Sequence, residues 1–234
     1  MNRVSDEPGF LLHRRDYRES SLLLELFTLN HGRVGVVARG ARRSRQGRSG
    51  LLQPFQPLLL GWAGRGELGT LTEVDRGPGV AGLVGSHLPY GFYLNELLMR
   101  LLPRDDPHPQ LFHHYREALQ SLAGEDATLR RFEVVLLQEL GYGLELTCDG
   151  QTGQPLDPDG HYRYELEKGP CAVADAADSP WVVSGATLLA LAKGEIPRDG
   201  HGESRRLMSR IMAHYLGDRP IRSRELLKKN WRRR

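Results

Sequence analysis

Residues 32–50 read GRVGVVARGARRSRQGRSG, so an alternating apolar run leads directly into a basic one. Two sets alternate along the first part: Val34, Val36 and Ala38 on one parity, Arg33 and Arg39 on the other. Because side chains alternate between the two faces of a strand, this spacing predicts a strand with an apolar inner face. Both arginines would then lie on its outer face.

The surrounding sequence repeats this kind of run. Five apolar-rich runs are separated by turn residues: 10–17, 21–30, 33–41, 52–63 and 67–75. Five short strands in so short a segment suit a small barrel, for which the five-stranded OB-fold is the common solution. GRGELG at residues 64–69 has the spacing of a dinucleotide-binding motif. A strand-like run follows it instead of a helix, so a hairpin turn is favoured.

The apolar period becomes helical after residue 80. Helical spacing covers the segments 90–101, 111–122, 129–140, 186–193 and 207–215. A last short helix is predicted to begin at Ser223, which is a suitable N-cap residue. The predicted fold is therefore α+β, with a five-stranded OB-fold barrel at residues 1–79 and an α-helical domain at residues 80–234. Glycine, proline and aspartate interrupt the helical domain at residues 145–180, which predicts a small irregular β insertion.

Charge is segregated along the chain, although the formal net charge is only +3. Residues 26–66 contain seven arginines and no acidic residue, and residues 219–234 contain eight Lys and Arg against one Glu. Residues 145–178 instead contain eight Asp and Glu against two basic residues. Such sorting favours a polyanionic partner. No apolar run reaches the ~18 residues of a membrane span, and no signal peptide is recognisable, so we expect a cytoplasmic protein.

Motifs for catalysis, metals and cofactors are missing from the sequence. Cys148 and Cys171 are not part of any C-x-x-C pair, so we expect reduced thiols and no metal site. No phosphate-binding G-x-x-x-x-G-K-[ST], H-E-x-x-H or G-x-S-x-G motif occurs, and the acidic residues are scattered. Glu96 and Arg100 are interpreted as an exposed i,i+4 pair. The sequence therefore predicts no enzyme activity and no cofactor.

The arginines of the barrel segment are the candidate nucleic-acid ligands. A guanidinium group binds phosphate in a bidentate manner and stays ionised at neutral pH. We expect DNA phosphates to be bound by Arg33, Arg39, Arg42, Arg43, Arg45 and Arg48. Contacts of this kind are independent of base sequence. An RNA-binding module and an adaptor that uses its charge for protein partners remain alternatives, and LLKKNWRRR at residues 226–234 is either a second basic patch or a disordered tail.

Five long segments of the chain resemble the RecO family of bacterial recombination mediators. They are GFLLHRRDYRESSLLLELFTLNHGRVGVVARGARR (9–43), LLQPFQPLLLGWAGRGELGTLTEVD (51–75), YLNELLMRLL (93–102), LRRFEVVLLQELGYG (129–143) and IRSRELL (221–227). The resemblance implies an OB-fold, a helical domain and an insertion that is a zinc module in part of the family. This sequence lacks the paired cysteines of that module.

The resemblance also implies an activity and its partners. A RecO-like protein would bind single- and double-stranded DNA, anneal complementary strands and be associated with the bacterial nucleoid. With RecR it would help RecA to load on DNA coated by single-strand-binding protein. A second site would take the C-terminal tail of that coating protein, around residues 114–124 and 129–135. Arg130 would bind the tail carboxylate, with Leu119 and Phe132 as apolar walls and with help from Arg116.

Overall fold

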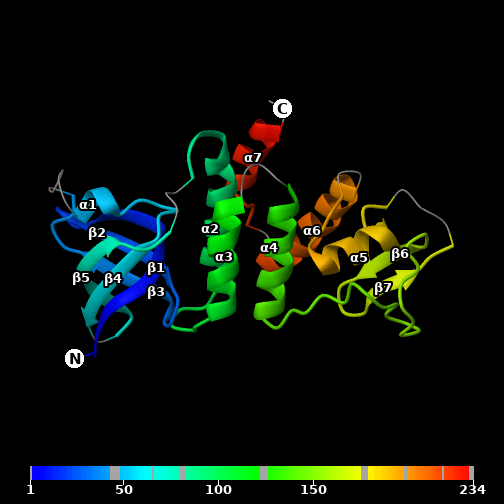
Figure 1. The fold of residues 1–234 in the computed structure, drawn as a ribbon, viewed down its shortest axis with the longest axis horizontal. Helices are drawn as coiled ribbons and strands as arrows, with labels where there is room; N and C mark the ends of the chain where they lie inside the picture. The colour runs from blue at the N-terminus through cyan, green and yellow to red at the C-terminus, as the bar shows by residue number, and fades with distance from the viewer. Residues whose placement is uncertain are drawn as a thin grey trace. The chain divides into compact units, whose positions relative to one another are not determined.

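The computed structural model (Figure 1) describes residues 2–42, 48–64, 66–79, 83–121, 126–174, 179–197, 200–217 and 219–231. The chain forms two compact units: residues 1–123 together with 221–234, and residues 124–220. It therefore leaves the first unit once and returns to it at its C-terminal end. The division predicted near residue 80 separates the barrel from the helices, whereas the compact units keep the barrel and the next two helices together.

Five strands close into a barrel at the start of the first unit. They are β1 (Asn2–Tyr17), β2 (Ser21–Thr28), β3 (Gly32–Ala38), β4 (Leu58–Gly64) and β5 (Leu68–Arg76). Their order around the barrel is β1-β2-β3-β5-β4, and β1 also pairs with β4. Every pairing is antiparallel except that of β3 with β5, which is parallel. The predicted five-stranded OB-fold barrel is thus confirmed.

The barrel core follows the alternation seen in the sequence. Val34, Val36 and Ala38 are only 5%, 0% and 4% exposed, as predicted for the inner face of β3. They pack with leucines of the other strands, among them Leu24 and Leu60, which are fully buried. Burial of apolar surface on this scale is the main contribution to the stability of the barrel.

The fourth strand begins later than the sequence predicts. Residues 52–57 contain two prolines, Pro54 and Pro57, which lack the N–H group that a central strand donates. A short helix, α1 (Arg48–Leu51), and a turn with Phe55 at φ +68° occupy the region before β4. The predicted hairpin at residues 64–69 is confirmed, because β4 ends at Gly64 and the antiparallel β5 begins at Leu68.

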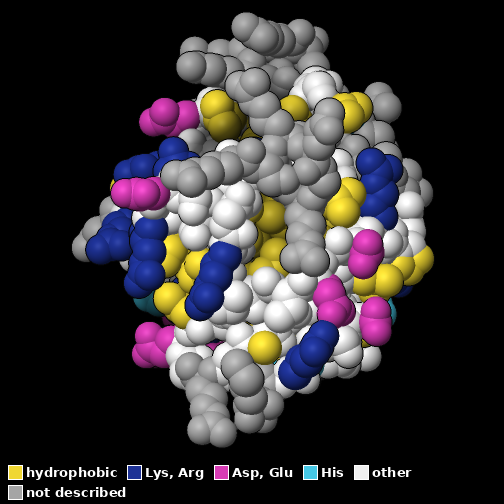
Figure 2. Space-filling model, turned by 90° about the vertical axis from the view of Figure 1, so that its left-hand side faces the viewer, with side chains coloured by type: hydrophobic (Ala, Val, Ile, Leu, Met, Phe, Trp, Pro, Cys, Tyr) yellow, Lys and Arg dark blue, Asp and Glu magenta, His cyan; other side chains and the backbone are white. Residues whose placement is uncertain are grey.

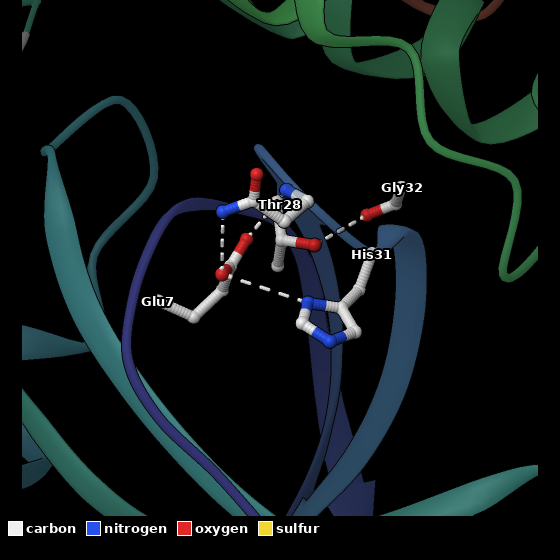
Figure 3. Close-up of polar contacts among 5 residues, drawn as sticks. Glu7, Thr28, His31 and Gly32 are labelled. Carbon is white, nitrogen blue, oxygen red and sulfur yellow. Dashed lines mark hydrogen bonds and ion pairs between the residues drawn. The ribbon is translucent and has the colours of Figure 1, made fainter.

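A buried carboxylate holds the β2–β3 turn (Figure 3). Glu7 accepts hydrogen bonds from the backbone N–H of Asn30 (2.6 Å) and from its side-chain amide (3.0 Å). The Nδ1 atom of His31 lies 3.5 Å from the same carboxylate, and the hydroxyl of Thr28 donates to the carbonyl of Gly32 (2.9 Å). The turn is therefore fixed at the end of β3 opposite to Arg39.

Two helices of the first unit pack on the barrel. They are α2 (Leu88–Leu101), preceded by the 3₁₀ turn η1 (Gly85–His87), and α3 (Pro109–Ser121). Phe10 of β1 contacts Phe112 and Tyr115 of α3, with ring centroids 5.4 and 5.1 Å apart. The buried Tyr115 hydroxyl donates to the side-chain carbonyl of Asn95 (2.5 Å), whose amide donates to the carbonyl of Leu12 (2.9 Å). This chain of hydrogen bonds links α3, α2 and β1.

The last helix, α7 (Ser223–Trp231), returns to the first unit and packs against α2. Its predicted start at Ser223 is confirmed. Glu96 of α2 lies 3.9 Å from Arg100, but its carboxylate also accepts the backbone N–H groups of Arg222 and Ser223 at 2.9 and 2.8 Å. The i,i+4 pair of Glu96 and Arg100 is thus confirmed, but it is not exposed, because the two side chains are 21% and 19% exposed and Glu96 also holds the start of α7.

The described residues of the second unit form three helices and a small sheet. The helices are α4 (Asp126–Glu139), α5 (Gly185–Lys193) and α6 (His201–Leu216), and the sheet has the order β7-β6-β8. Its strands are β6 (His161–Glu165), β7 (Gly169–Ala172) and β8 (Val182–Ser184). The predicted β insertion is confirmed as this separate sheet. No helix in the described part of the chain is long and apolar enough to cross a membrane.

Candidate nucleic-acid interface

The end of β3 and the β1–β2 turn lie side by side at one end of the barrel. Across the sheet Arg15 is opposite Leu23, and Leu23 is opposite Val37. Directly paired residues share a face, so Arg15 faces outward together with Val37, two residues before Arg39. The backbone N–H of Arg42 also donates to the carbonyl of Ser20 at 3.0 Å. The strand pairing therefore gathers arginines from two distant segments of the sequence.

Arg39 is the predicted DNA ligand that the structure leaves most available. Its side chain is exposed just beyond the end of β3. Within the described ranges, no acidic side chain forms an ion pair with it. In a view onto the barrel, Lys and Arg side chains gather over one flank with a few acidic side chains between them (Figure 2).

Arg42 is exposed but already has partners. Its Nη2 atom lies 3.1 Å from the carboxylate of Asp16, and its Nη1 atom donates to the carbonyls of Arg18 (3.2 Å) and Glu19 (3.3 Å). Since these are surface contacts, a phosphate could replace the Asp16 carboxylate at small cost. Through these contacts, Arg42 attaches the segment after β3 to the β1–β2 turn.

Arg33 is not freely presented on the outer face, contrary to the prediction. Its side chain is 16% exposed and donates to the carbonyl of Met99 at 3.1 Å. The carboxylate of Glu25 lies 3.6 Å away and also pairs with Arg104. Burial lowers the pKa of Arg33, the charge of Glu25 opposes this and the charge of Arg104 adds to it. Arg33, Glu25 and Arg104 therefore form a clamp between the barrel and the segment after α2.

The basic residues at the end of β1 and in the turn after it were not among the ligands predicted from the sequence. Arg15 and Arg18 are exposed, and the guanidinium group of Arg18 lies 5.3 Å from the centre of the Tyr17 ring. Arg18 also has a positive φ of +52°, which is uncommon for a residue with a side chain. The signal was present as HRRDYR at residues 13–18. These residues become candidate DNA ligands only because strand pairing places them beside Arg39.

The remaining predicted barrel ligands are not described. Arg43 and Arg45 lie outside the described residues, and for Arg48 only the backbone, at the start of α1, is described. Their assignment to DNA binding remains a prediction.

The residues predicted to bind the tail of single-strand-binding protein are divided between the two compact units. Arg116 is exposed and Leu119 is buried on α3, in the first unit. Arg130 and Phe132 belong to α4, in the second unit, and are 3% and 2% exposed. The Nη1 atom of Arg130 lies 2.9 Å from the carboxylate of Glu133. To bind a tail carboxylate, Arg130 would have to exchange this internal partner.

Charge divides sharply between the two units. The first unit contains 22 Lys and Arg against 13 Asp and Glu, an excess of nine positive charges. Residues 124–220 contain 10 against 16, an excess of six negative charges. The unit that contains the barrel is therefore the one suited to a polyanion.

A carboxylate, and not a metal-ligand cluster, organises the turn of the β insertion. Asp149 accepts the backbone N–H groups of Thr152 and Ala172, both at 2.8 Å, and these bonds, that of Thr152 first, lower the pKa of Asp149. Cys148 and Cys171 are free thiols. Among the described residues, no three His, Cys, Asp or Glu side chains are grouped as metal ligands. The described side chains around the two thiols therefore do not fit a zinc module.

The fold and charge together define a class: an OB-fold protein whose barrel unit is strongly basic and carries exposed arginines at one end. Residues 1–76 match the model of the recombination protein O N-terminal domain. Residues 85–225 match the model of the recombination protein O C-terminal domain.

Similar proteins include "DNA repair protein RecO" of Methylococcus capsulatus, which is 51% identical over 232 residues and aligns over 97% of this chain and 94% of its own length. The protein of the same description from Alkalilimnicola ehrlichii is 49% identical over 96% of this chain and 91% of its own. That of Aromatoleum aromaticum is 44% identical over 97% and 96%. The chain therefore belongs to the RecO family of DNA repair and recombination proteins.

Proposed function

We propose that this protein binds single- and double-stranded DNA through the arginine-bearing end of its barrel and anneals complementary strands. The observation that carries the proposal is the gathering of Arg15, Arg18 and Arg39 at one end of a barrel whose unit has nine excess positive charges. Arginine forks bind phosphate oxygens without reading bases.

Annealing requires two polyanions to approach each other. A cationic surface lowers their repulsion and releases counterions, while contacts confined to phosphates leave the base edges free to pair. Tyr17 adds one aromatic ring beside Arg18, which suits stacking with an unpaired base. The arrangement supports a task in which the protein must hold strands without competing for their bases.

In this proposal Arg39, Arg15 and Arg18 make the first contacts with phosphates. Arg43, Arg45 and Arg48 follow Arg39 in the sequence and are proposed as further ligands. Arg42 would also bind a phosphate once that phosphate replaces the Asp16 carboxylate. Arg33 would contribute to DNA binding only from within its clamp with Glu25 and Arg104.

The proposal extends to the partners of recombinational repair. With RecR the protein would help load RecA on DNA coated by single-strand-binding protein, and the tail of that protein would bind near Arg116, Leu119, Arg130 and Phe132. The family membership supports this cellular role. Binding of a fluorescent tail peptide to wild type and to Arg116→Gln tests the tail site, and unchanged affinity would remove Arg116 from it.

Salt titration of DNA binding tests the central claim. If about six phosphates are contacted, affinity for a fluorescent oligonucleotide should fall roughly 10³-fold between 50 and 200 mM salt. The variants Arg39→Gln and Arg18→Gln should weaken binding and slow annealing. Arg3→Gln is the matched control, because Arg3 is equally charged and pairs with Glu73 at 2.7 Å on a solvent-exposed part of the barrel. Equal effects of all three variants would contradict the proposed interface, and competition with RNA of the same sequence would separate DNA from RNA binding.

A further inference from the structure

The C-terminal segment, residues 221–234, determines the sign of the charge of the whole chain. It contains seven Lys and Arg against Glu225. The preceding 220 residues contain 25 Lys and Arg against 28 Asp and Glu, so without the segment the formal charge would be −3 instead of +3. Of the nine excess positive charges in the first unit, six come from these fourteen residues. A concentration of this kind favours a polyanionic ligand.

Glu96 of α2 fixes the start of this segment. Its Oε1 atom accepts the backbone N–H of Arg222 (2.9 Å), and its Oε2 atom accepts the N–H (2.8 Å) and the hydroxyl (2.7 Å) of Ser223. The first N–H groups of a helix have no partner within the helix, and a negative charge there also interacts favourably with the helix dipole. Glu96 thus supplies from another helix the carboxylate that caps α7.

Packing completes the attachment of the segment to the first unit. Ile221, Ser223 and Leu227 are buried, with 7%, 5% and 1% exposure. The guanidinium group of Arg224 lies 6.0 Å from the centre of the Tyr93 ring of α2. The side chain of Arg222, in contrast, is exposed. The start of the basic segment, Arg222–Arg224, is therefore held to α2, and α7 continues the segment as a helix to Trp231.

We propose that the C-terminal segment is a second binding surface for the phosphate backbone of DNA, with Glu96 as its positioning residue. The inference rests on the proposed DNA binding by the barrel and adds a second element to it. DNA is favoured over an acidic protein because the segment belongs to the compact unit that carries the barrel arginines. Both elements then act on one polyanion, and the loss of either lowers the number of released counterions.

One substitution distinguishes the positioning role of Glu96 from the effect of its negative charge. Glu96→Gln removes a negative charge from a basic unit, so charge alone predicts unchanged or tighter DNA binding. The amide also places an N–H donor among the N–H donors of α7, which loosens the cap. We therefore expect Glu96→Gln to bind a fluorescent oligonucleotide at least about threefold more weakly at 50 mM salt. Glu117→Gln is the matched control, since Glu117 is an exposed residue of α3 in the same unit and does not bond to α7.

A second variant tests the surface without altering the cap. In the chain of 234 residues, Lys228→Gln with Lys229→Gln removes two charges of α7 and should lower the slope of log affinity against log salt by about two. Circular dichroism and urea unfolding show whether each variant is folded. If the lysine variant keeps the wild-type slope, or affects binding of an acidic peptide but not of DNA, the inference is overturned. It is also overturned if folded Glu96→Gln binds as tightly as Glu117→Gln. Absence of salt-dependent DNA binding by the wild type would instead refute the proposed function itself.

Discussion

Replacement of Glu25 by glutamine should destabilise the first unit, because Glu25 is the only carboxylate in the clamp of Arg33, Glu25 and Arg104. Its side chain is 10% exposed, and the two arginine side chains are 16% and 33% exposed. Removal of one partner from a fully buried ion pair costs about 3–5 kcal/mol. Water reaches Arg104, so we expect a smaller loss of about 2–3 kcal/mol in the free energy of unfolding.

A matched substitution exists in the same barrel. Glu73 pairs with Arg3 at 2.7 Å, but the two side chains are 44% and 65% exposed. Glu73→Gln should therefore cost at most about 1 kcal/mol, as is usual for surface ion pairs. Urea unfolding followed by the fluorescence of Trp62 measures both variants, with Trp181 and Trp231 replaced by phenylalanine so that Trp62 is the remaining tryptophan. Equal stability of the two glutamine variants would refute the clamp.

The other predictions concern the buried hydrogen-bond chain, the two roles of arginine and pH. Asn95→Leu removes the acceptor of the Tyr115 hydroxyl and the donor to the Leu12 carbonyl. It should cost about 2–3 kcal/mol by urea unfolding, and a loss below about 0.5 kcal/mol would contradict this. Arg33→Gln should mainly lower stability, whereas Arg39→Gln should mainly lower DNA affinity. If both variants lose stability and affinity in parallel, the assignment of separate roles to the two arginines is wrong. Backbone N–H groups lower the pKa of Asp149, so its contribution to stability is present above its unfolded pKa of about 3.9 and is lost as the pH falls through the lower folded value. The difference in stability between wild type and Asp149→Asn should therefore shrink below about pH 4, whereas a constant difference would exclude this cause.

Local sequence patterns were sufficient to predict the barrel. The alternation through Val34 and Val36 fixes which face of β3 is buried, and the glycine turn at residues 64–69 fixes the β4–β5 hairpin. The start of β4 was predicted too early, because residues 52–63 read as one apolar run despite Pro54 and Pro57. The residue type of Ser223 was enough to predict where α7 starts, although the carboxylate that caps this start belongs to the distant Glu96.

The roles of individual charged residues could not be predicted in the same way, because their partners are distant in sequence. Arg33 has the right parity for an outward position, but Glu25 and Arg104 reach it through tertiary packing. Arg42 bonds to a turn more than 20 residues earlier, and Glu96 bonds to residues 126 and 127 positions later. Residue type shows that a charge is present, and only the fold shows whether a protein group already neutralises it.

The return of α7 to α2 has a consequence for biosynthesis. Glu96 leaves the ribosome well before Ser223, so the first unit cannot be completed until the residues of α7 have been made. Residues 124–220 form their own compact unit and can fold during this delay. A copy that ends before Ser223 would leave uncovered the part of α2 that α7 packs against, and proteases that act on exposed apolar surface would preferentially degrade it.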